Sequence, residues 1–401
     1  MKKLIWLLLF SVTPAFAVPV KVAEAPFNDL ALTVQAIETA QTYLLINIYE
    51  LSSQDVADAI IGRISAGVHV ELLEEGQPVG GMSKAGKNIQ GRIAKAMEKA
   101  GNEDHFYVMT SKADPKNPVK RRFRFDHAKY IVADGARLLI GSENYSPTGN
   151  PEPGKIGNRG WEVLIGDSTV AANFQKVFRG DTDNSNDDVV DMMALSQTAT
   201  QNRVLQPESL ADVEELKRIA REMPTFDSPS IRPIFSPDTS LDGLLTLLDQ
   251  AKSSIDVEQM TLDSMWGGPD TKSPLVASLV AAARRGVTVR VLLNDESVFE
   301  RPGSKSRPKN EPTVDLLNKL GSDEGLNISA RIADVKAMKV DYIHNKGALV
   351  DGKFTLVSSI NWNENAVEKN RESAVIVEGT EIFSHYEAIF ENDWKVSEDS
   401  K

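Results

Sequence analysis

Two segments of the chain repeat the same polar residues at the same spacing. The first contains His127, Lys129, Ser142 and Asn144, and the second contains His344, Lys346, Ser359 and Asn361. His127 and His344 are 217 residues apart, and so are Asn144 and Asn361. Because the chain has only five histidines, this register is strong evidence that the two segments share one function.

The residue types indicate chemistry on an anion. An unperturbed imidazole titrates near pH 6.5, so it can act as a nucleophile or as an acid near neutral pH. Lysine adds a fixed positive charge, and the asparagine amide donates hydrogen bonds. On a β-strand, His-x-Lys places both side chains on one face, since side chains alternate. Two such sets predict a site in which two histidines take opposite roles.

An aspartate follows each histidine by seven residues, at Asp134 and Asp351. In a regular strand this odd offset directs the carboxylate to the face opposite the histidine. The spacing therefore predicts that both aspartates organise structure and do not touch a substrate.

The elements around these segments are also repeated. In each half a strand, an amphipathic helix, a glycine and a second strand follow one another. In the first half these are 42–48, 54–65, Gly67 and 68–73. In the second half they are 254–260, 274–285, Gly286 and 287–293. Further strands are expected at 138–140 and 354–357. Alternating strands and helices predict α/β/α domains. We expect a signal peptide at 1–17, one domain at 18–180, an acidic linker and connecting helix at 181–225, and a second domain at 226–401.

Composition excludes several classes of protein. The chain has 401 residues, no cysteine and a formal net charge of −12, which excludes disulfides and thiolate metal sites. Lys2 and Lys3, a short apolar run and Ala15-Phe16-Ala17 form a secretory signal pattern. We expect cleavage near Ala17, a periplasmic or secreted protein, and a mature charge of −14. The acidic run 181–191 is interpreted as a solvated linker, with a metal site as the alternative.

The duplicated motif resembles the HKD signature of the phospholipase D superfamily, although Ser358 stands where that family usually has glycine. The resemblance implies two α/β/α domains related by a pseudo-two-fold axis, with one active site at their interface. It also implies a phosphohistidine on His127, with His344 as the acid. The implied catalytic set is His127, His344, Lys129, Lys346, Asp134, Asp351, Glu162 and Glu372, and the implied substrate-binding set is Lys129, Lys346, Ser142, Asn144, Ser359 and Asn361.

Glu162 and Glu372 enter this set as the acidic residues that follow each motif, expected to hydrogen-bond a histidine. The extra Gly160-Trp161 in the first copy makes the assignment of Glu162 the weaker of the two. No metal or other cofactor is expected.

The substrate stays open between two classes. We expect a monomeric enzyme that cleaves or exchanges phospholipid head groups, with a secreted nuclease as the alternative. A basic run, Lys116, Lys120, Arg121, Arg122 and Arg124, precedes His127. It is interpreted as a solvated rim that steers an anionic substrate, with a nucleic-acid groove as the alternative. The acidic net charge argues against nucleic acid. Trp266, in a Gly-Pro loop, is either an anchor for transient membrane-surface contact or an ordinary packed residue.

Overall fold

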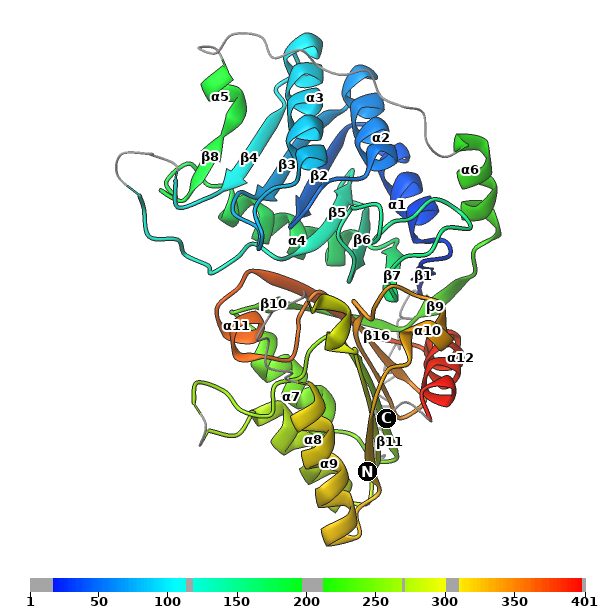
Figure 1. The fold of residues 1–401 in the computed structure, drawn as a ribbon. Helices are drawn as coiled ribbons and strands as arrows, with labels where there is room; N and C mark the ends of the chain where they lie inside the picture. Colours follow the sequence, from blue (N-terminus) through cyan, green and yellow to red (C-terminus); the bar gives the residue numbers. More distant parts are fainter. Residues whose placement is uncertain (1–16, 113–117, 197–211, 269–270, 301–309, 399–401) are drawn as a thin grey trace, which may run out of the picture.

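The computed structural model describes residues 17–112, 118–196, 212–268, 271–300 and 310–398. The chain forms two halves, each built on one β-sheet with helices packed against it (Figure 1). The predicted signal peptide lies outside the described residues except for Ala17. No helix within these ranges combines the length and apolar character that a bilayer crossing requires.

The first sheet has nine strands. Their order is β8 (Val189–Asp191), β4 (His105–Met109), β3 (His69–Glu75), β2 (Tyr43–Ile48), β5 (Lys129–Ala133), β6 (Arg137–Gly141), β7 (Gly160–Ile165), β1 (Val18–Ala25) and β9 (Thr225–Ser228). Strands β2, β3 and β4 are parallel, and β5 pairs antiparallel with β2.

The second sheet repeats seven of these positions. Its order is β13 (Ile328–Ile332), β12 (Thr288–Leu293), β11 (Ser254–Gln259), β14 (Lys346–Val350), β15 (Phe354–Ser358), β16 (Glu372–Glu378) and β10 (Ser230–Ser236). This order matches β4-β3-β2-β5-β6-β7-β1 strand for strand. The duplication and the α/β class predicted from the sequence are thus confirmed.

The helices form an outer layer on each half and a middle layer between the sheets. The outer helices are α1 (Asp29–Glu38), α2 (Gln54–Ser65), α3 (Lys84–Ala100) and α6 (Val213–Glu222) on the first half, and α7 (Ser240–Asp249), α8 (Pro274–Arg284) and α9 (Asn310–Glu324) on the second. The middle helices are α4 (Ser168–Asp181) and α12 (Thr380–Val396). Short helices complete the chain at α5 (Met192–Ser196), η1 (Glu296–Phe299), α10 (Val335–Met338) and α11 (Glu364–Glu368).

Strand alternation explains how the halves join. In β5, Tyr130 and Val132 face a core shared by both sheets, whereas Ile131 packs under the outer helices of the first half. In β14, Leu349 belongs to the shared core and Ala348 to the outer core of the second half. Because both faces of these strands are buried, the residues that follow the first lysine of each strand are apolar or glycine. The histidine-bearing strands therefore lie in the interior, where the two halves meet.

The acidic segment 181–191 is solvated only in part, because Asp183 and Asp187 are exposed whereas two other aspartates are not. Asp181 ends α4 and forms an ion pair with Arg371, and Asp188 forms one with Arg122. Both carboxylates are buried, and the segment continues into β8 of the first sheet. Arginine partners from distant parts of the chain stabilise these charges, and composition alone does not reveal such partners.

Candidate active site

Each histidine of the repeated motif stands just before an inner strand and is fixed by the opposite half. The backbone N–H of His127 donates to Arg371 O at 2.7 Å, and that of His344 donates to Arg159 O at 2.9 Å. These bonds extend two bridges, Asp126 with Arg371 and Arg159 with Ile343. The site is therefore built by reciprocal pairing between the halves.

A carboxylate from the opposite half also holds each imidazole. His127 Nδ1 lies 2.8 Å from Glu372 Oε2, and His344 Nδ1 lies 3.1 Å from Glu143 Oε2. A carboxylate only accepts hydrogen bonds, so each Nδ1 carries the proton and donates it. Each Nε2 is then left for a substrate.

Glu162 does not occupy the place that we expected. It accepts a hydrogen bond from Thr33 Oγ1 at 3.1 Å, and burial, with Asp29 nearby, raises its pKa well above the usual value. The carboxylate at His344 is Glu143, which lies between Ser142 and Asn144 and has isoleucine as its counterpart in the second half, so the repeat does not single it out. Glu372, in contrast, lies where it was predicted.

The two carboxylates occupy equivalent surroundings although they come from different positions in the repeat. Glu372 accepts hydrogen bonds from Ser359 Oγ at 2.7 Å and from Asn370 Nδ2 at 2.9 Å. Glu143 accepts them from Ser142 Oγ at 3.2 Å and from Asn158 Nδ2 at 2.9 Å. The serine and asparagine positions match between the halves.

Gly160 allows the carboxylate of the first half to come from a different position in the repeat. In the repeated Asn-Arg dipeptides, Asn158-Arg159 precedes Gly160 whereas Asn370-Arg371 precedes Glu372. A Cβ atom added at Gly160 would come within 2.2 Å of Glu143 Oε1. The first half thus has glycine where the second has glutamate, and the vacated space holds the carboxylate of Glu143. Ile360 occupies the matching position in the second half.

Ser142 and Ser359 were expected to bind substrate, but the structure gives them a supporting position. Both are fully buried. Besides its carboxylate, Ser142 Oγ accepts a hydrogen bond from the backbone of Trp161, and Ser359 Oγ accepts one from Ser373 N. They orient the glutamates. Asn144 and Asn361 are partly exposed, which is consistent with the predicted contact to substrate.

Both lysines are buried beside their own histidines. Lys129 Nζ donates to His127 O at 2.7 Å, and Lys346 Nζ donates to His344 O. Burial lowers the pKa of Lys129 to about 8 and that of Lys346 to about 7. An anionic ligand would favour the charged form of both.

Burial also lowers the pKa values of both histidines. It lowers the pKa of His127 to about 4, against the attraction of Glu372. It likewise lowers the pKa of His344 to about 4, and the positive charge of Lys346 acts in the same direction. Before substrate binds, both imidazoles are therefore neutral at neutral pH. A bound phosphodiester anion would raise both pKa values, so substrate itself favours protonation of the acid.

Asp134 and Asp351 lie away from the imidazoles, as strand alternation predicted, and their place in the catalytic set is therefore corrected. Each lies in a left-handed turn, with φ of 53° and 57°. Asp134 accepts backbone hydrogen bonds from residues 41–43, and Asp351 accepts them from residues 252–254. They tie the start of β2 and of β11 to the turn after the histidine strand.

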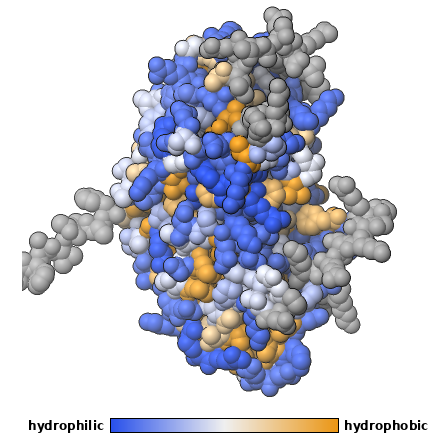
Figure 2. Space-filling model, turned by 90° about the vertical axis from the view of Figure 1, so that its left-hand side faces the viewer, coloured by the Kyte–Doolittle hydropathy of each residue, from blue (hydrophilic) through white to orange (hydrophobic). Residues whose placement is uncertain are grey.

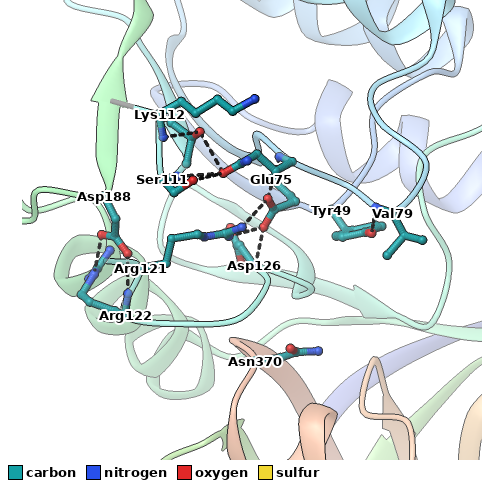
Figure 3. Close-up of polar contacts among 12 residues, drawn as sticks. Tyr49, Glu75, Val79, Ser111, Lys112, Arg121, Arg122, Asp126, Asp188 and Asn370 are labelled. Atoms are coloured by element: carbon teal, nitrogen blue, oxygen red, sulfur yellow. Dashed lines mark hydrogen bonds and ion pairs between the residues drawn. The ribbon is translucent and has the colours of Figure 1, made fainter. Parts of the chain in front are cut away.

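The basic run before His127 is largely committed to internal contacts. Figure 3 shows Arg121 directed at Glu75 and Arg122 at Asp188. Glu75 also accepts the backbone N–H of Asp126 at 2.8 Å, next to His127. The run therefore positions the histidine segment. Lys116 lies outside the described residues.

Trp266 is the packed residue of the two alternatives, since it is only 5% exposed and belongs to the outer core of the second half. The alternative in which Trp266 anchors the protein at a membrane does not fit this burial. The indole lies among aliphatic side chains that the sequence alone did not place beside it.

Comparison with known proteins places this geometry in a family. A family model described as "Cardiolipin synthase, PLD-like domain" matches twice, over residues 33–182 and 244–394. A mitochondrial cardiolipin hydrolase from Xenopus laevis is 28% identical over 188 residues, covering 44% of this chain and 77% of that protein. The Mus musculus protein of that name is 27% identical over 164 residues, covering 41% of this chain and 62% of its own length.

A solved structure shares the whole architecture. Phosphatidylserine synthase from Haemophilus influenzae aligns with a TM-score of 0.64 at 14% identity, covering 95% of this chain and 88% of that one. At this identity the likeness concerns the fold, with both halves included. The two matches of the family model cover most of the chain. The chain therefore belongs to the phospholipase D superfamily and contains two PLD-like domains.

Proposed function

We propose that this phosphodiesterase cleaves or exchanges phospholipid head groups through a phosphohistidine intermediate. The observation that carries the proposal is the pair of imidazoles, each with Nδ1 bound to a carboxylate and with a buried lysine beside it. This arrangement gives one site two Nε2 atoms and two cations. Cardiolipin hydrolases among the relatives support a phospholipid as the substrate class.

The proposed reaction has two displacements. His127 Nε2 attacks phosphorus, and the P–N bond forms as the bond from phosphorus to the leaving oxygen breaks. The His344 imidazolium gives its proton to that oxygen. Water or an alcohol then attacks the phosphohistidine, its proton passes to His344, and the P–N bond breaks.

The lysines supply the positive charge for this chemistry. Lys129 and Lys346 would hold the non-bridging oxygens, with the amides of Asn144 and Asn361 beside them, most strongly as charge develops in the transition state. Glu372 and Glu143 stabilise the imidazolium forms and fix the tautomers. Export through the N-terminal signal, and action as a monomer, remain parts of the proposal.

One assay tests the substrate class. Purified protein is offered phosphatidylcholine vesicles and single-stranded DNA side by side, with His127→Asn as the inactive control. We expect release of head groups and, with a few per cent of ethanol present, formation of phosphatidylethanol. DNA cleavage with no lipid product would reject the proposal in favour of a nuclease. The internal ion pairs of Arg121 and Arg122 weaken the nuclease alternative.

A further inference from the structure

Several large apolar side chains are exposed, and most of them lie around the site. In the described part of the chain, those more than a third exposed are Phe27, Val79, Ile156, Val213, Val298 and Phe299. Isolated exposed apolar residues are normal in proteins, whereas a group of them around one site is not. Four of the six belong to three segments that are linked to the site through Tyr49, Tyr342 or Asn158.

Val79 is connected to His127 through Tyr49. It is 79% exposed and belongs to the loop between β3 and α3. Its backbone N–H donates to the hydroxyl of Tyr49 at 2.7 Å, and the Tyr49 ring lies 4.6 Å from the His127 ring, centre to centre. Figure 3 shows the Val79 side chain on the side of Tyr49 that is away from Asp126.

The second half repeats this arrangement with Phe299. This residue is 47% exposed and lies in η1, after β12, the strand equivalent to β3. Its ring is 4.9 Å from that of Tyr342, which in turn is 5.8 Å from the His344 ring. A tyrosine thus separates an exposed apolar side chain from the histidine in both halves.

Two further residues extend this set. Val298 is 39% exposed and adjoins Phe299, and Ile156 is 64% exposed. Ile156 lies in the loop between β6 and β7, two residues before Asn158, which bonds the carboxylate at His344. We call Val79, Ile156, Val298 and Phe299 the apolar rim.

We propose that the apolar rim docks the protein on the surface of a phospholipid bilayer, an inference that rests on the proposed phospholipid substrate. The rim, the two tyrosines and the two buried lysines follow one another from the surface inward. A bilayer presents a matching order, because acyl chains, the interfacial zone favoured by tyrosine, and phosphate groups are adjacent layers. A phosphodiester could then reach the lysines while its acyl chains stay with the membrane.

The rest of the surface suits insertion of the apolar rim into a bilayer better than electrostatic attraction of the whole protein to charged lipid. The face in Figure 2 is mainly hydrophilic, with separate hydrophobic patches, several of them at mid-height. The net charge of −12 opposes attraction to anionic lipid. Binding through the rim should therefore depend on apolar burial, which salt does not screen.

The test measures sedimentation of the full chain with phosphatidylcholine vesicles, without any need for turnover. Val79→Ser and Phe299→Ser should each weaken vesicle binding by about tenfold, since each removes an exposed apolar side chain that the bilayer would bury. The matched control is Val213→Ser on α6, which is 48% exposed but outside the rim, and it should bind like the unchanged chain. Thermal unfolding of each variant reports whether its fold is intact.

Three results would overturn docking by the rim: no vesicle binding by the unchanged chain, equal binding by the rim variants, or binding abolished by high salt. Loss of binding confined to the rim variants supports it. Vesicle binding without release of any head group would contradict the proposed function and leave the docking surface standing. The two proposals can therefore fail separately.

Discussion

Replacing Glu143 with glutamine tests how the second histidine is controlled. The variant keeps the shape of the side chain, and a glutamine oxygen can still accept the Nδ1–H of His344, now 3.1 Å from Glu143. What it removes is a buried negative charge. A hydrogen bond to a charged group contributes about 1.5–3 kcal/mol, which corresponds to roughly 10- to 150-fold in the population of the imidazolium.

The assay should compare two leaving groups. Release of choline from phosphatidylcholine needs an acid, so Glu143→Gln should lower kcat by about 10- to 150-fold. Release of p-nitrophenol from bis(p-nitrophenyl) phosphate needs little protonation, so the same variant should lose much less. Glu372→Gln, at the proposed nucleophile, should affect both substrates.

Because the carboxylate stands at position 143 in the first half and at the position matching Gly160 in the second, a double variant can test whether moving it restores kcat. Glu143→Ile copies the isoleucine of the second half and should be as impaired as Glu143→Gln. Adding Gly160→Glu places a carboxylate in the vacated space and should restore part of the lost kcat. Glu162→Gln is the control, because Glu162 is bonded to Thr33 and should be nearly silent. A large loss in Glu162→Gln, or none in Glu143→Gln, would refute the assignment.

Three further predictions concern other parts of the site. Because the pKa of Lys346 is lowered to about 7 and that of Lys129 to about 8, both lose charge as pH rises, so kcat/KM should fall through this range; a Lys346→Arg variant whose kcat/KM falls just as steeply would contradict this. In quenched digests analysed by mass spectrometry after reaction with bis(p-nitrophenyl) phosphate, His344→Asn should retain a phosphoryl adduct on His127, and an adduct on His344 of the unchanged chain would reverse the two roles. Arg121→Ser leaves the buried Glu75 carboxylate without its arginine and should cost about 3 kcal/mol in denaturant unfolding, whereas Lys120→Ser, at an exposed position, should change stability by less than about 0.5 kcal/mol.

Much of this protein is readable from its sequence because the information is local or repeated. Strand and helix periods placed β2, α2 and β3 and their counterparts within a residue or two. The equal spacing of His127 and His344 from their asparagines identified the shared site. The odd offset also predicted that Asp134 lies away from the imidazole, although Asp134 is in the left-handed turn after β5 and outside the regular strand.

The tertiary structure decided the features that depend on distant partners. Whether a buried carboxylate bonds a histidine depends on side chains from the other half, and Glu143 reaches His344 only because Gly160 leaves it room. The basic run and the acidic segment each read as solvated charge, but Arg122 and Asp188 neutralise one another across the fold. A one-dimensional pattern records residue type and spacing; which charges meet, and which are buried when they do, is determined by packing.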